Sequence, residues 1–336
     1  MAGVTLKKLA ELSGLSVRTV NRVLKDQGDV APEKRELVRR LARQYKYIPN
    51  IAARNFRLRR KNIVGVLTGD RIGSEADLQK VAELERRLLG AGYYPMLGST
   101  RENSVRRTLE EWNGTVDFVV SFRHPQTPEA LEVPADFPCS FIFVDCPAPE
   151  RHHRIAINRE CGIAAAYRCL TDAGCRRIVH CGTSGLRRKF VEHITSGRQG
   201  GIEFAYVRTE HPEIEDGFAA GDAIMRSGAD AVFFDTDRMA VGFYRYAWAH
   251  RIRIPDDISV VGFDDDSVSK VLPPPLSTVA HPVAEIADAI VGIVTSAPRR
   301  SRADHARHRA GTPRQHPPRL KTPRSADILC TVKFFA

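Results

Sequence analysis

Long hydrophobic runs and a regular cysteine pattern are both missing from this sequence. Its 336 residues contain no stretch of the roughly 18 apolar residues that a membrane span requires, and the N-terminus has no apolar segment of signal-peptide length. The seven cysteines are odd in number, show no C-x-x-C spacing and lie mostly inside apolar runs. That usage is typical of reduced, buried thiols in an intracellular protein. We therefore expect a cytoplasmic protein with no membrane partner.

Signals for catalysis, metal binding and cofactors are also missing. The segment GTSGLRRK at 182–189 lacks the Gly-Lys pair of a phosphate-binding loop. The consecutive carboxylates of Asp264, Asp265 and Asp266 rarely converge on one ion, and no Ser, His and Asp set stands at motif spacing. We therefore expect no enzyme activity, no metal site and no cofactor.

Charge is distributed unevenly along the chain. Residues 1–61 contain sixteen basic and five acidic residues, and residues 298–336 contain ten basic and two acidic residues. Residues 62–297 contain 25 basic and 33 acidic residues, which makes this part acidic. Because polyanions bind basic surfaces, only the two ends of the chain suit a nucleic acid.

The first 48 residues are expected to form an all-helical head. Thr5 and Ser16 are placed to cap two successive helices, and Gly14 stands in the turn between them. Pro32 suits the first position of a third helix, where Glu33 matches the positive end of the helix dipole. The spacing therefore predicts three short helices joined by tight turns.

The second predicted helix, LSVRTVNRVL at 15–24, has an apolar back and a basic front. Val20 and Val23 would point inward, whereas Arg18 and Arg22 stand four residues apart and share the outer face. By shape alone an ordinary helical hairpin is the commoner interpretation. The positive charge of the head favours a helix-turn-helix instead, in which the second helix lies in the major groove of DNA.

From Asn62 the pattern changes to short apolar runs that alternate with helix-like stretches, which predicts parallel sheets built from β-α-β units. The last 39 residues, 298–336, are rich in Arg, His and Pro and are expected to be disordered, with ILCTVKFF as a candidate short strand. An altered C-terminus and a basic arm that adds nonspecific DNA affinity are the two interpretations of this tail. The chain thus divides into a head at 1–48, a linker at 49–61, a body at 62–297 and a tail at 298–336.

Several motifs resemble one family in the right order. They are VTLKKLAELSGLSVRTVNRVL at 4–24, YIPNIAARNFR at 47–57, AGCRRIVHCG at 173–182, DRMAVGFYRYAWAHRIRIPDDISVVGFDD at 237–265 and PPLSTVAHPV at 274–283. Together they resemble the lactose-repressor/galactose-repressor (LacI/GalR) family over about residues 3–297. The resemblance implies a helix-turn-helix head and a periplasmic-binding-protein-like effector domain of two parallel-sheet subdomains. It also implies a dimeric, ligand-responsive transcription regulator, more often a repressor, that binds a near-palindromic double-stranded operator.

The resemblance also implies which residues contact DNA. It assigns base contacts to Val17, Arg18 and Arg22, and backbone contacts to Thr5, Ser16, Thr19, Asn21 and Asn50. An arginine such as Arg22 can bond guanine O6 and N7 with two prongs. Residues 50–57 resemble the hinge helix, which is too short to be stable alone and would place Ala53 and Phe56 in the minor groove. The alternative for Phe56 is a core aromatic that packs on the body.

For the effector, the resemblance implies Asp264, Asp237, Thr236 and Arg187 as binding residues and a sugar or related metabolite as the ligand. A carboxylate such as that of Asp264 can accept two hydrogen bonds from hydroxyl groups. A strand-end or helix-capping aspartate is the competing interpretation. A small-molecule binding protein with no role on DNA is the alternative function, and it would have a neutral head and an export signal.

Overall fold

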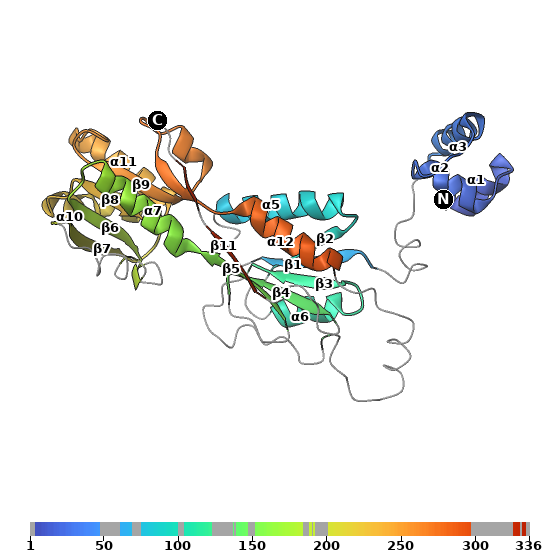
Figure 1. Ribbon diagram of the computed structural model, residues 1–336, viewed down its shortest axis with the longest axis horizontal. Coiled ribbons are helices and arrows are strands. Elements are labelled where there is room, and N and C mark those ends of the chain that lie inside the picture. Colours follow the sequence, from blue (N-terminus) through green and yellow to red (C-terminus); the bar gives the residue numbers. More distant parts are fainter. Residues whose placement is uncertain are drawn as a thin grey trace. The chain divides into compact units, whose positions relative to one another are not determined.

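The computed structural model describes residues 4–47, 61–68, 75–99, 104–122, 137, 139–146, 152–183, 188, 189, 191, 201–296, 325–329 and 331–333. Two compact units make up the chain, residues 1–62 and residues 63–336 (Figure 1). Asn50, Ala53, Phe56 and Arg187, which were predicted to contact DNA or effector, lie outside the described residues.

The first unit has the three predicted helices, α1 (Leu6–Ser13), α2 (Val17–Leu24) and α3 (Pro32–Gln44). The side chain of Thr5 accepts from the backbone N–H of Lys8, and that of Ser16 accepts from the N–H of Thr19. Gly14 ends α1 with a left-handed φ of 64°, which glycine adopts without steric cost. The core of the unit is apolar and consists of Leu9, Ala10, Val20, Val23, Val30 and Val38.

Helix α2 ends in a left-handed turn made by an aspartate. Asp26 has a φ of 53°, its N–H donates to Val23 O, and the N–H of Gln27 donates to Arg22 O at 2.9 Å. These two bonds satisfy the last carbonyls of the helix. The Asp26 carboxylate also forms ion pairs with Arg39 and, at 3.5 Å, with Arg35, and so fastens the end of α2 to α3.

The second unit contains two six-stranded sheets. The first sheet has the order β11-β5-β4-β3-β1-β2 and is parallel throughout. Its strands are β1 (Ile63–Thr68), β2 (Tyr94–Ser99), β3 (Phe118–Ser121), β4 (Ser140–Val144), β5 (His153–Asn158) and β11 (Ser325–Leu329). The helices that follow β1, β2 and β5 are α5 (Glu75–Gly90), α6 (Ser104–Trp112) and α7 (Arg159–Asp172).

The second sheet has the order β12-β10-β9-β8-β6-β7, in which only β12 runs antiparallel to its neighbour. Its strands are β6 (Arg177–Thr183), β7 (Glu203–Thr209), β8 (Ala231–Phe234), β9 (Ser259–Asp264), β10 (Ser277–Ala280) and β12 (Thr331–Lys333). Its helical segments are α9 (Ile214–Ala219), α10 (Gly221–Arg226), α11 (Asp237–His250) and a 3₁₀ turn η2 (Ser267–Lys270). Helix α12 (Val283–Ser296) follows β10.

Along the described strands the chain changes sheet three times, between β5 and β6, between β10 and β11, and between β11 and β12. The two lobes are therefore joined by several segments that are far apart in the sequence, as the ribbon shows (Figure 1). This arrangement confirms the prediction of two parallel-sheet subdomains. No helix among the described residues is both long and apolar enough to cross a membrane.

The candidate strand ILCTVKFF lies where the structure has two short strands, so residues 325–329 and 331–333 are ordered, unlike the expectation for the tail as a whole. Strand β11 pairs in parallel with β5 from Ser325 with Arg154 to Leu329 with Asn158, and β12 pairs with β10. The basic, proline-rich composition that dominates 298–324 obscured the short apolar segments that follow it. Those segments supply backbone groups that complete the ladders of two sheet edges.

Two glycines allow α9 and α11 to lie almost in backbone contact. A Cβ atom on Gly217 would fall 1.9 Å from the carbonyl oxygen of Met239, and one on Gly242 would fall 1.9 Å from that of Ile214. Neither obstacle is the end of a flexible side chain, so the two helices would have to separate to admit a methyl group. Close packing of these helices therefore depends on glycine at both positions.

Gly242→Ala should lower the free energy of unfolding of the second unit by about 1–3 kcal/mol, because overpacking against a fixed backbone forces the helices apart. The matched control is Gly292→Ala in α12, where a Cβ meets nothing within 4 Å. That change should raise the free energy of unfolding by about 0.5–1 kcal/mol. Urea denaturation of both variants measures the difference, and equal effects would contradict the packing role of Gly242.

Asp26→Ala should destabilise the first unit by about 1 kcal/mol more than Asp26→Gly does. Both changes remove the ion pairs to α3, but only glycine adopts the left-handed conformation without steric cost. Calorimetric unfolding of the full chain, read at the transition of the helical unit, tests the difference. A larger loss for the glycine variant would show that the turn imposes no strain at this position.

Candidate DNA-binding face and ligand site

Helix α2 presents one apolar face to the core and one basic face to solvent. Val20 and Val23 have relative exposures of 0% and 1%, whereas Val17 is 39% exposed. Arg18 and Arg22 are both exposed, on the side away from the core. The structure therefore brings the three predicted base-contact residues to one outer surface.

The two arginines of this face differ from those of α3. Within the described part of the chain, neither Arg18 nor Arg22 forms an ion pair, whereas Arg35 and Arg39 are paired with Asp26. Arg22 lies over the turn that follows α2, because a Cβ atom on Gly28 would fall 2.2 Å from its Nη2. The outer face of α2 is thus a positively charged surface that no carboxylate of the described head neutralises.

The predicted backbone-contact residues lie at helix starts. Thr5 and Ser16 precede the first residues of α1 and α2, and Ser16 Oγ is 2.9 Å from Thr19 Oγ1. Free N–H groups and the positive dipole end at a helix start favour phosphate oxygens. Asn21 is half-buried between the two faces of α2. Of these groups, Ser16 and Thr19 lie at the start of the helix that carries the two arginines.

Asp264 stands at the carboxyl end of β9 in a turn of unusual conformation. Its φ is 114° and that of Asp265 is 60°, values that few residues other than glycine adopt. The Asp264 Oδ1 atom lies 3.1 Å from Nε2 of His281. Burial lowers the pKa of His281, although the hydrogen bond to Asp264 acts in the opposite direction. A neutral His281 ring therefore donates its Nε2–H to the Asp264 carboxylate.

Asp237 is a brace for that turn rather than a group open to solvent. It is 0% exposed, its Oδ1 accepts from the Thr278 hydroxyl at 2.6 Å, and its Oδ2 accepts from the N–H of Asp266 at 2.8 Å. Burial raises the pKa of Asp237 to about 8, although both hydrogen bonds act in the opposite direction. Asp237 was predicted to contact an effector, but both of its carboxyl oxygens already accept hydrogen bonds from within the protein.

Thr236 is a helix cap. Its hydroxyl accepts from the N–H of Met239 at 3.3 Å and donates to the carbonyl of Pro212 at 3.2 Å. Of the two loop arginines after β6, only Arg188 is described, and its guanidinium lies 5.0 Å from the centre of the Tyr206 ring. The Tyr206 hydroxyl in turn donates to the carbonyl of Gly182 at 2.8 Å.

A buried histidine–aspartate pair escaped the sequence reasoning. His180 Nε2 lies 2.9 Å from Asp235 Oδ1, and Asp235 Oδ2 accepts from the N–H of Thr183 at 2.9 Å. The position of Asp235 directly after the run AVFF was the available signal, because the ends of adjacent parallel strands meet at one sheet edge. At 1% exposure His180 cannot reach a substrate, so the pair ties β6 to β8. No group of three or more metal-ligating side chains occurs in the residues that the structure covers.

Asp237→Asn should change how stability varies with pH. The folded pKa of about 8 lies above the ordinary value of 3.8, so the native state holds a proton that the unfolded state releases between these values. Wild type should therefore lose stability relative to Asp237→Asn as the pH rises from about 5 to 8. Urea midpoints at several pH values measure the difference, and a constant gap would contradict the raised pKa.

One family match lies in each of the two units. Residues 5–50 match "Bacterial regulatory proteins, lacI family", and residues 167–321 match "Periplasmic binding protein-like domain". The ribose operon repressor of Haemophilus influenzae is 26% identical over 298 residues, which cover 84% of this chain and 88% of that protein. The transcriptional repressor PurR of Vibrio cholerae is 26% identical over 295 residues, which cover 83% and 86%.

Solved structures share the fold. The Lac repressor bound to ONPG in its repressed state has a TM-score of 0.72 at 21% identity and covers 99% of both chains. The Lac repressor dimer bound to operator and the anti-inducer ONPF has a TM-score of 0.69 at 20% identity and covers 98% of both. With its basic helix-turn-helix head and its two-lobed body, the chain belongs to the LacI family of bacterial transcriptional regulators and is not an enzyme.

Proposed function

We propose that this ligand-responsive, DNA-binding repressor acts in the cytoplasm and reads a near-palindromic operator as a homodimer. The observation that carries the proposal is on α2, where Arg18 and Arg22 are exposed and pair with no carboxylate of the described residues, while the opposite face of the helix is buried in the core of the head. A symmetric dimer would place one α2 in each of two major-groove half-sites.

Within each half-site, Arg22 and Arg18 read base edges and Val17 packs on a thymine methyl group. A two-pronged arginine contact with guanine discriminates against other bases by about 1–3 kcal/mol. Thr5, Ser16, Thr19 and Asn21 bind the backbone, where hydroxyls, amides and helix starts set the register without reading sequence. From the linker outside the described residues, Asn50 also binds the backbone, whereas Ala53 and Phe56 act at the minor groove, with Phe56 inserted between central base steps.

The homodimer is supported by symmetry, because two identical heads match the two equivalent half-sites of a near-palindromic operator. A second copy of the chain is the partner that a near-palindromic operator requires, and the operator-bound relative is a dimer.

The effector is a sugar or a related metabolite that hydrogen-bonds Asp264. The strained turn holds this carboxylate at the end of β9, where Asp264 is 7% exposed and is bonded to His281, and carboxylates bind the hydroxyls of such ligands through hydrogen bonds. Relatives of the same fold were solved with ribose, cellobiose and lactose bound. Asp237 supports this site by accepting from the N–H of Asp266 in the turn, and Thr236 supports it by capping the start of α11. Arg187, which follows β6 in the sequence, supplies a positive charge.

Arg22→Ala should relax the sequence preference at one base position of each half-site and weaken binding by about 1–3 kcal/mol. Selection of bound sequences from a random DNA pool measures this with the full-length protein. Arg40→Ala removes an equal charge from α3 and should leave the selected sequence unchanged. An unaltered sequence preference in Arg22→Ala would contradict the assigned role of Arg22, and failure of the wild type to enrich any sequence would contradict DNA recognition itself.

A further inference from the structure

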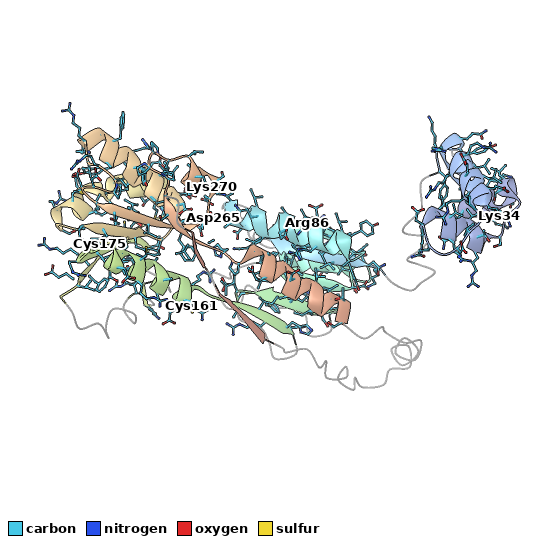
Figure 2. The ribbon with its side chains drawn as sticks, turned by 45° about the horizontal axis from the view of Figure 1, so that its top comes forward. Lys34, Arg86, Cys161, Cys175, Asp265 and Lys270 are labelled. Atoms are coloured by element: carbon cyan, nitrogen blue, oxygen red, sulfur yellow. The ribbon has the colours of Figure 1, made fainter. Side chains whose placement is uncertain are left out.

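One contact joins the first turn of a helix on the first sheet to a turn that leaves the second sheet. The N–H and the hydroxyl of Ser267, at the start of η2, both donate to Oε2 of Glu75, the first residue of α5, and both distances are 2.9 Å. The other oxygen of Glu75 accepts from Nε2 of Gln79 at 3.3 Å. Asp265 and Lys270, on either side of Ser267 in sequence, lie beside this end of α5 (Figure 2).

The Ser267 side of the contact is held in place by the turn that carries Asp264. Asp237 accepts from the N–H of Asp266, the residue directly before Ser267, and the N–H of Asp265 donates to the Thr278 hydroxyl at 3.4 Å. With Asp264 and Asp265 in left-handed conformations, few other arrangements of this turn are open. A ligand that shifts Asp264 therefore shifts Ser267, three residues further along.

The Glu75 side is held by its own lobe. Helix α5 packs along α12, with an ion pair between Arg87 and Asp288 and a hydrogen bond of 3.3 Å from the Tyr93 hydroxyl to the carbonyl of Val294. Helix α5 also follows β1, the strand that begins directly after the linker to the head. A displacement of Glu75 would therefore displace α5, which belongs to the lobe that follows the linker in the sequence.

We propose that Glu75 and Ser267 form a clasp between the two lobes, and that Glu75 is a positioning residue which couples occupancy at Asp264 to operator affinity. This inference rests on the proposed function. A hydrogen bond of this kind makes only a modest net contribution to stability, because it replaces hydrogen bonds that both groups would otherwise make with water. A clasp of that strength biases an equilibrium between two lobe arrangements without locking either one, as a reversible switch requires.

The test uses the full-length protein and three variants. Glu75→Ala removes the acceptor, Ser267→Ala removes one donor, and Glu75→Gln keeps an acceptor oxygen while removing the charge. Amide hydrogen exchange is measured in the segment that was not changed. For a Glu75 variant this is the segment around Ser267, and for the Ser267 variant it is the start of α5, so a purely local effect of the substitution is excluded. Glu75→Ala should speed exchange in residues 264–271, and Ser267→Ala should speed exchange in the first turns of α5, with Glu75→Gln close to wild type.

Operator affinity is the second measurement, with the DNA sequence selected by the wild type as the probe. Glu75→Ala and Ser267→Ala should change the dissociation constant about two- to tenfold in the same direction. The double variant should match Glu75→Ala, because two changes to one contact are not additive. Unaltered exchange in the segment that was not changed, or additive changes in affinity, would overturn the clasp. If the wild type itself binds no DNA, the proposed function fails, and exchange alone then decides whether the clasp exists.

Discussion

Burial of Val20 and Val23 decides which side of α2 faces solvent. Because both side chains pack into the small core of the head, the helix cannot rotate about its axis without exposing them to water. Arg18 and Arg22 are therefore directed outward in the free protein, before any DNA is bound. The capping hydroxyls of Thr5 and Ser16 and the ion-paired turn at Asp26 fix where α1 and α2 begin and α2 ends, so position as well as rotation is set in advance.

The head was predictable because its signals are local. Capping residues, a glycine in the turn and apolar residues at helical spacing all act within a few positions of one another, and the predicted helices, caps and core residues are those observed. The alternation of short apolar runs with helix-like stretches in the body is also a local signal, and it predicted the parallel sheets. The candidate strand ILCTVKFF overlaps β11 only at Ile328 and Leu329. The start of β11 was missed because its pairing partner, β5, lies far away in the sequence and the composition before it is typical of disorder.

The ligand site was harder to predict than the fold. Asp237 and Asp264 are both aspartates beside strand ends, and nothing within either motif tells the two apart. Only the folded chain shows that Thr278, 41 positions after Asp237, donates its hydroxyl to Asp237, and that His281 bonds Asp264. The Asp237 carboxyl group therefore accepts a hydrogen bond that stabilises the strained turn, and Asp264 lies in that turn. Strain of this kind persists only where the surrounding bonds hold it.

The last two strands have a consequence for the order in which this protein can be built. β11 closes one edge of the first sheet and β12 one edge of the second, although only Cys330 separates them in the chain. A polypeptide emerging from the ribosome therefore exposes an open edge on each lobe until these residues appear, long after the head has been synthesised. The head can therefore fold before either lobe is complete, whereas the two lobes are completed together, because β11 and β12 are adjacent in the sequence.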